Sequence, residues 1–167
     1  MADLDGLLAP LISGRDAGLM SEAGCPAVAD PGALLVRRAH EMNIAVVPLV
    51  GPSSLLLALM ASGLNGQSFA FHGYLPVDEE ARNKRIRELE TESARHARTQ
   101  LFIETPYRNG RMFEALRNSC RPDTRLCVAC DLTLESESIT TRSIADWKKT
   151  PSPDLNRRPT VFLILAT

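Results

Sequence analysis

Two apolar runs near the N-terminus each lead into a turn rich in Gly, Pro and Ser. Residues 17–21 (AGLMS) precede the turn at 22–32 (EAGCPAVADPG), and residues 44–50 (IAVVPLV) precede the turn at 51–54 (GPSS). A helical pattern follows each turn. In parallel α/β sheets, such turns connect a strand to a helix at the edge where ligands bind. The stretch 19–63 therefore predicts an α/β layer that carries half of a binding site for a small organic cofactor.

The helices around these turns have recognisable start signals. Asp30 suits an N-cap and Pro31 suits the first helical position, where its missing N–H costs nothing; Pro52 repeats this arrangement. A short helix is also predicted at 4–13, broken or starting late because Pro10 fits a helix interior poorly. The order helix, strand, helix, strand, helix indicates a parallel α/β layer. Two or three strands are too few for a self-sufficient sheet, so this first domain is expected to be incomplete.

The chain changes character after residue 66, where we place a domain boundary. Residues 1–66 form the partial N-terminal α/β domain, and residues 67–167 form a C-terminal mixed α+β domain. Alternation and apolar runs predict strands at 68–72, 100–104, 126–132, 138–142 and 160–166, and helices at 78–97 and 110–119.

Composition narrows the classes of function. The chain has 167 residues and a net charge of −1, which argues against a broad basic surface for nucleic acid, although a local patch is compatible with it. No run of about eighteen apolar residues occurs, so no membrane span is predicted. The N-terminus is acidic where a signal peptide needs basic residues, so a cytoplasmic location is expected.

Metal and thiol chemistry are not predicted. The three histidines lie far apart in the sequence, without the spacing of metal ligands. Cys127 and Cys130 form a C-x-x-C pair inside an apparent buried strand, and residues three apart on a strand point to opposite faces. We interpret all four cysteines as reduced thiols.

Four motifs follow one another in a fixed order: SEAGCPAVADPG, VVPLVGPSSLLLALMASGL, FAFHGYLP and FIETPYRN. This series resembles the tetrapyrrole methylase superfamily of S-adenosylmethionine-dependent methyltransferases. Within it, the chain is most similar to the ribosomal RNA small-subunit methyltransferase I branch, whose patterns read S-D-A-G-x-P-x-x-x-D-P-G, P-G-P-S, S-G-L-P, F-x-G-F-L-P and E-S-P-H-R. The resemblance covers nearly the whole chain.

The resemblance implies two α/β domains with S-adenosyl-L-methionine in the cleft between them, and a homodimer. The cofactor-binding residues that it implies are Ala23, Gly24, Cys25, Val28, Ser53, Ser54 and Glu104. Each also has a structural interpretation: packing within the turn for Cys25 and Val28, helix-start caps for the serines, and a charge at a strand end for Glu104.

The implied activity is 2′-O-methylation of a nucleotide in small-subunit ribosomal RNA. A ribose hydroxyl is a poor nucleophile and benefits from a base. The candidates for the base are Glu104, His72 and Asp131, and Arg108 is the candidate for contacting phosphate. Two alternatives stay open: a methyltransferase acting on a tetrapyrrole or other small molecule, and a non-catalytic fragment that only dimerises.

The chain also departs from the family pattern. Glu22 replaces Asp, Leu49-Val50 replaces P-x-P, and Thr105 and Tyr107 replace Ser and His, which suggests a divergent subgroup. Family members begin upstream with a strand and a T-P-I-G-N turn, which have no counterpart here. The sequence is therefore expected to be a fragment, to have a misplaced start or to be truncated. We expect it to leave an apolar sheet edge exposed and to bind the methyl donor weakly or not at all by itself.

Overall fold

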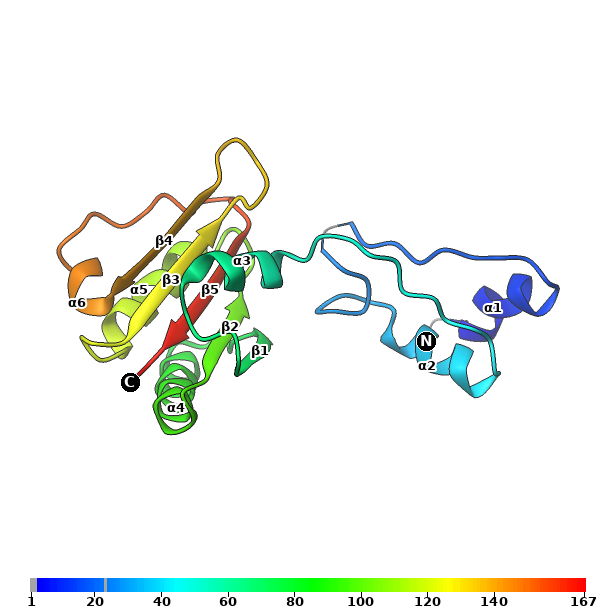
Figure 1. Cartoon of the computed structure of the whole chain (residues 1–167), viewed down its shortest axis with the longest axis horizontal. Helices are drawn as coiled ribbons and strands as arrows, with labels where there is room; N and C mark the ends of the chain where they lie inside the picture. The colour runs from blue at the N-terminus through cyan, green and yellow to red at the C-terminus, as the bar shows by residue number, and fades with distance from the viewer. Residues whose placement is uncertain (1–2, 23) are drawn as a thin grey trace. The chain divides into compact units, whose positions relative to one another are not determined.

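A computed structural model describes residues 3–22 and 24–167. The chain divides into two compact units, Met1–Ser53 and Ser54–Thr167. Each unit is described by itself, and both appear in Figure 1. The division precedes the helix at residues 54–62, because this helix packs on the sheet of the second unit. The domain boundary after residue 66 stays a prediction.

The described residues of the first unit form two helices, α1 (Leu4–Ile12) and α2 (Ala33–Glu41). The carboxylate of Asp3 caps α1 by accepting the N–H of Gly6 at 2.9 Å. Arg38 on α2 donates from Nε to Asp5 on α1 at 2.7 Å, which joins the two helices. Pro10 lies inside α1, contrary to the expected break. Because Pro10 has no N–H, the carbonyl of Gly6 lacks its usual i→i−4 partner within α1.

Neither strand predicted in the first unit forms. Residues 15–20 and 44–53 carry no strand ladder, and the side chains of Val47 and Leu49 are 75% and 90% exposed. A strand needs a neighbour that takes up its backbone hydrogen bonds, and no described residue fills that role for these two segments. The expected capping by Asp30 is also wrong: Gly32 is the N-cap of α2, without a side-chain cap.

The second unit is built on a mixed five-stranded sheet in the order β1-β2-β5-β3-β4. The strands β1 and β2 pair in parallel, and the other three pairings are antiparallel. All five strands confirm the sequence prediction: β1 (Phe69–Tyr74), β2 (Thr99–Ile103), β3 (Arg125–Cys130), β4 (Ser138–Ser143) and β5 (Thr160–Leu165).

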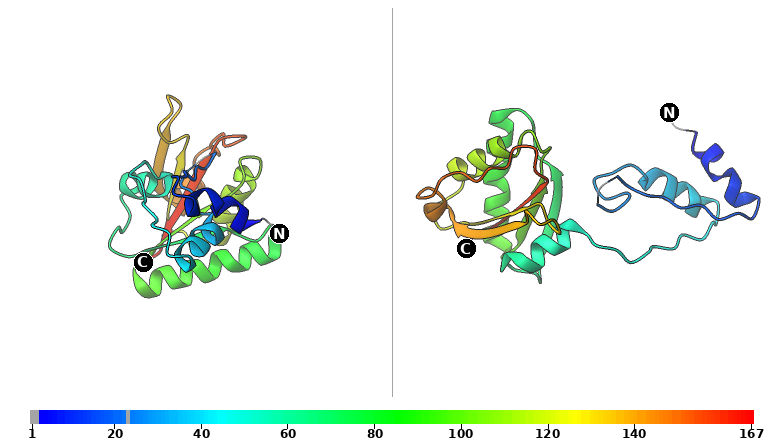
Figure 2. Two further views of the ribbon diagram at one scale, coloured as in Figure 1. Left: turned by 90° about the vertical axis from the view of Figure 1, so that its right-hand side faces the viewer. Right: turned by 90° about the horizontal axis from the view of Figure 1, so that it is seen from above.

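Helices cover both faces of this sheet (Figures 1 and 2). The apolar helix α3 (Ser54–Ser62) packs on one face through Ala58 and Leu59, against Leu101 and Leu163. The other face is covered by α4 (Glu79–His96) and α5 (Asn109–Ser119), whose buried side chains meet a stack of Phe102 and Phe162 with ring centroids 6.0 Å apart. As expected, Cys127 and Cys130 lie in the clusters on opposite faces of the sheet.

A short helix that the sequence did not indicate, α6 (Ile144–Trp147), follows β4. Its Trp147 is buried and donates from Nε1 to the carbonyl of Leu126 at 2.9 Å. The Trp147 ring also meets the ring of Phe113 edge-on, with the ring centroids 5.2 Å apart. None of the helices in the described ranges combines the length and apolar character needed to cross a bilayer.

Candidate functional site

The first Gly/Pro turn has an unusual backbone. Gly24, Ala27 and Ala29 all have positive φ, at 78°, 65° and 54°. Residues with a Cβ rarely adopt this conformation, which costs about 1–3 kcal/mol each at Ala27 and Ala29 and is concentrated at functional sites. A Cβ placed on Gly24 would meet nothing within 4 Å, so open space adjoins the backbone at this residue.

The first and second turns meet inside the first unit. The thiol of Cys25 donates to the carbonyl of Pro52 at 3.7 Å. This hydrogen bond joins the first turn to Pro52, the residue before Ser53. A cofactor site shared by the two turns stays a prediction. Val28 is 48% exposed, while Cys25 and Ser53 are partly buried. Ala23 lies outside the described residues, and Ser54 begins α3 in the second unit.

Glu104 lies directly after β2 and is almost fully buried. One carboxylate oxygen, Oε1, accepts from Arg108 Nη2 at 2.7 Å and from the N–H of Thr105 at 2.6 Å. Arg108 also donates from Nε to the hydroxyl of Thr105 at 3.1 Å. Glu104, the predicted cofactor contact, and Arg108, the predicted phosphate contact, therefore form one ion pair at the end of β2.

Asp131 occupies the matching position after β3. Its Oδ2 accepts from the Ser136 hydroxyl at 2.8 Å and from Arg158 Nε at 2.7 Å. Arg158 also donates to the carbonyl oxygens of Asp154 and Ser136, which joins the β3–β4 loop to the loop before β5. The hydrogen bonds from Ser136 and Arg158 hold the pKa of the Asp131 carboxyl below its usual range. A carboxylate with a lowered pKa is a weak proton acceptor.

The three candidate bases lie at one edge of the sheet. Because β1, β2 and β3 run in the same direction, His72, Glu104 and Asp131 all lie near carboxyl ends. Pairing of β5 with β2 and β3 puts Glu104 and Asp131 on either side of Thr160. His72 has an uncharged partner, since its Nε2 lies 2.6 Å from Oε1 of Gln100.

Sequence reasoning missed Arg157, Arg158 and Asn109. Asn109 is fully buried and donates from Nδ2 to the Arg158 carbonyl at 2.7 Å, and Arg157 lies over the ring of Tyr107. The sequence carries one signal for these residues. Two consecutive arginines precede Pro159 at the end of a Pro-rich loop, directly before the last strand.

Several curated proteins are similar to this chain in sequence. The chain is 35% identical over 159 residues to the ribosomal RNA small subunit methyltransferase I of Xylella fastidiosa, covering 95% of this chain and 57% of the relative. It is 33% identical over 159 residues to the protein of the same name from Vibrio cholerae, covering 95% and 54%. The chain thus spans about half the length of the curated relatives it matches. No family model matches it.

Two solved structures have a similar fold. The methyltransferase CobJ superposes with a TM-score of 0.65 at 22% identity, covering 100% of this chain and 72% of the other. The cobalt precorrin-4 methyltransferase CbiF, a cobalamin biosynthetic enzyme, gives 0.60 at 15% identity, covering 97% and 69%.

Over 95% of its length, the chain is similar to proteins named ribosomal RNA small subunit methyltransferase I. This similarity confirms the resemblance found in the four sequence motifs. The expected superfamily fold is likewise confirmed by the two solved structures.

Two residues of the turn after β2 depart from the family pattern. The replacement at Thr105 keeps a hydroxyl group, whereas the replacement at Tyr107 changes the type of side chain. Thr105 replaces a serine and still offers a hydroxyl, which accepts from Arg108. Tyr107 replaces a histidine by a larger aromatic ring that is 74% exposed. The turn after β2 therefore keeps its internal hydrogen bond but presents a different surface.

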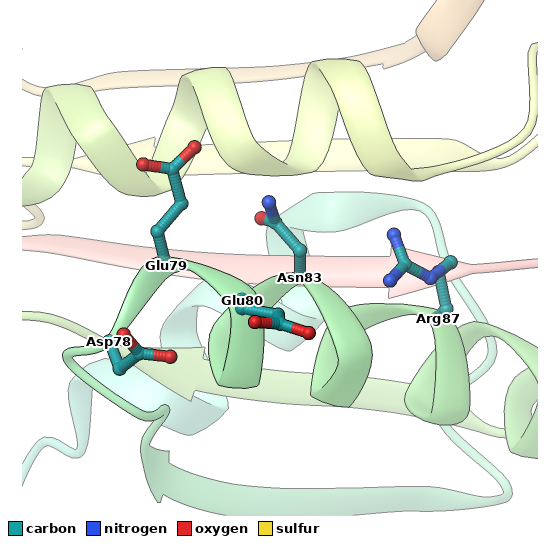
Figure 3. A pocket seen from close by; sticks show the side chains of 5 residues that line it. All are labelled: Asp78, Glu79, Glu80, Asn83 and Arg87. Atoms are coloured by element: carbon teal, nitrogen blue, oxygen red, sulfur yellow. The ribbon is translucent and has the colours of Figure 1, made fainter.

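A hollow over α4 is a poor match to a polyanionic substrate of this superfamily branch. It has a volume of about 400 Å³ and is lined by Asp78, Glu79, Glu80, Asn83 and Arg87, with Glu79 and Asn83 pointing toward α5 (Figure 3). Three carboxylates near the start of a helix interact favourably with the helix dipole, but they repel the phosphates of a nucleic acid. Among the described residues, no group of three His, Cys, Asp or Glu side chains is arranged to hold a metal ion.

Proposed function

We propose that the protein represented by this chain is an S-adenosylmethionine-dependent methyltransferase that acts on the 2′-hydroxyl of a small-subunit ribosomal RNA nucleotide. The observation that carries the proposal is the similarity, over 95% of the chain, to proteins named ribosomal RNA small subunit methyltransferase I. One of the two solved structures is a cobalt precorrin-4 methyltransferase, but at 15–22% identity the two structures support the fold and not a tetrapyrrole acceptor.

The first unit fits a role in holding the cofactor. Open space at Gly24 allows a ligand to approach the backbone, and the Cys25–Pro52 contact brings the two turns together. We propose that Ala23, Gly24, Cys25 and Val28 contact the methyl donor, with Ser53. When bound, S-adenosylmethionine supplies an electrophilic methyl group on a sulfonium.

In the second unit we propose that Ser54 and Glu104 also contact the cofactor, and that Arg108 binds a phosphate. Glu104 is held in one orientation by Thr105 and Arg108, which suits a residue that positions a ligand. Positioning can lower a reaction barrier by about 7–11 kcal/mol, so a strong base is not essential.

The proton acceptor is proposed to be His72 or Glu104. The ring of His72 is hydrogen-bonded to a neutral amide, that of Gln100. Asp131 is the weaker candidate, because its hydrogen bonds lower its pKa. We further propose, from the family resemblance, that the protein is a cytoplasmic homodimer.

The proposal is tested in a strain from which the gene has been deleted. Mass spectrometry of its small-subunit ribosomal RNA is expected to show the loss of one 2′-O-methyl mark, restored by the wild-type gene. The variant Gly24→Val should not restore the mark, since a branched residue at a φ of 78° disrupts the turn. The matched control Gly66→Ala should restore it, because Gly66 lies in open space without positive φ. If deletion removes no methyl mark, the proposal is wrong.

A further inference from the structure

Two loops that are distant in the sequence are fastened together at the carboxyl edge of the sheet. The N–H of Arg157 donates to the carbonyl of Pro106 at 3.2 Å, and buried Asn109 donates from Nδ2 to the Arg158 carbonyl at 2.7 Å. These two bonds hold the turn after β2 against the loop before β5. They also bring Tyr107 and Arg157 side by side.

The guanidinium of Arg157 lies over the Tyr107 ring, with Cζ 5.7 Å from the ring centroid. Tyr107 is nevertheless 74% exposed, so its ring keeps a face that is open to a ligand. A Tyr with one face covered by a cation and the other open is suited to stacking against a flat ring.

The charge of Arg157 is also available. Its neighbours Arg108 and Arg158 are each paired with a buried carboxylate, Glu104 and Asp131. Within residues 3–22 and 24–167, no carboxylate lies within ion-pair distance of Arg157. Its backbone has a φ of 59°, a conformation that side-chain-bearing residues seldom adopt, and the bond to Pro106 keeps it there.

We propose that Tyr107 and Arg157 form a platform on which an unpaired RNA base stacks, with Arg157 contacting the adjoining phosphate. Proteins recognise single-stranded RNA by stacking splayed bases on aromatic rings and arginine planes, with cations along the backbone. The net charge of the chain is −1 and the hollow over α4 is acidic, so neither provides a broad basic surface for RNA. Contact with RNA therefore requires a local patch such as this one. The platform rests on the proposed function and names a substrate contact within it.

The test measures binding of a short single-stranded RNA that carries 2-aminopurine, whose fluorescence is quenched on stacking. Stacking tolerates any base, so the natural target sequence is not required. Tyr107→Ala is expected to weaken binding by about 5- to 100-fold and to abolish the quenching. Tyr107→Phe keeps the ring and should retain both. Tyr74→Ala, which removes the other tyrosine of the chain at a 53% exposed site, should bind like wild type.

Arg157→Gln provides a second readout. It should weaken binding and reduce the salt dependence of the binding constant by about 0.7 in the logarithmic slope, as expected for one lost phosphate contact to a single strand. Circular dichroism of each variant checks that the second unit is folded.

The outcomes separate the platform from the proposed function. Equal effects of Tyr107→Ala and Tyr74→Ala, or unaltered quenching in Tyr107→Ala, would overturn the platform while leaving methylation of ribosomal RNA in place. If wild-type protein does not bind the RNA, the platform is also wrong. The proposed activity is tested separately, by the loss of the methyl mark in the deletion strain. If the mark survives deletion but RNA binding depends on Tyr107, the platform stands and the activity is wrong.

Discussion

Glu104 accepts a hydrogen bond from Arg108 at 2.7 Å while only 2% of the Glu104 side chain and 32% of the Arg108 side chain is exposed. The two residues are four apart, at the end of β2 and just before α5. A buried carboxylate that loses its cation is left without compensation, so the two side chains should be energetically coupled.

Glu104→Gln is expected to lower the free energy of unfolding by about 1–2 kcal/mol, because a charge-assisted hydrogen bond becomes a neutral one. Arg108→Ala should lower the free energy of unfolding by about 1–3 kcal/mol. This loss is smaller than for a fully buried ion pair because Arg108 is partly solvated. The double variant should cost less than the sum by at least about 0.5 kcal/mol in urea unfolding. The exposed Arg111→Ala is the control, at about 0.5 kcal/mol or less. Strict additivity would contradict the coupling.

Asp131 predicts a pH dependence of stability. Ser136 and Arg158 lower its pKa in the folded state below the value of about 3.9 expected when unfolded. This contribution is therefore fully present above about pH 4 and is lost as the pH falls through the lower folded-state pKa. Asp131→Asn should be less stable than wild type at neutral pH, and the difference should shrink in acid. Urea midpoints measured from neutral to acidic pH check this. A difference that does not vary with pH would rule it out.

The four cysteines should differ sharply in reactivity. Burial, assisted by nearby Glu90, raises the pKa of Cys120 to about 12, and burial raises the pKa of Cys127 and Cys130. The thiolate is the reactive form, so these three should resist iodoacetamide in the native protein. Cys25 is partly exposed and should be alkylated first. Mass mapping of the alkylated peptides provides the measurement, with full labelling in denaturant as the control.

The same labelling examines the cofactor site. If the first turn holds the methyl donor, S-adenosylmethionine should slow alkylation of Cys25, and ATP at the same concentration should not. Equal rates with both compounds at saturating S-adenosylmethionine would count against a contact with Cys25.

The core of the second unit should depend on the stacked phenylalanines. Phe102 is fully buried between the sheet and α4–α5, so Phe102→Ala should cost about 3–5 kcal/mol in urea unfolding. Met60 on α3 is 79% exposed, and Met60→Ala should cost about 0.5 kcal/mol or less. A large loss for Met60 would mean that this side of α3 is covered in solution.

Local periodicity in the sequence was sufficient for most of the second unit. It predicted all five strands and the helices α4 and α5. The spacing of Cys127 and Cys130 correctly indicated opposite faces of β3. These features follow from the repeat of a helix or strand, which neighbouring residues alone define.

Contacts between distant residues decided the rest. Residues 44–50 have the composition of a buried strand but form none, because strand structure depends on a hydrogen-bonding partner elsewhere in the chain. The pairing of Tyr107 with Arg157 depends on the bonds that tie two loops together, and no local pattern encodes it. The sequence by itself determined the strands and the two long helices of the second unit and the resemblance to known methyltransferases, through short-range periodicity and motif order. Only the tertiary structure decided which strands form and which loop residues meet, because those outcomes depend on hydrogen bonds between segments far apart in the chain.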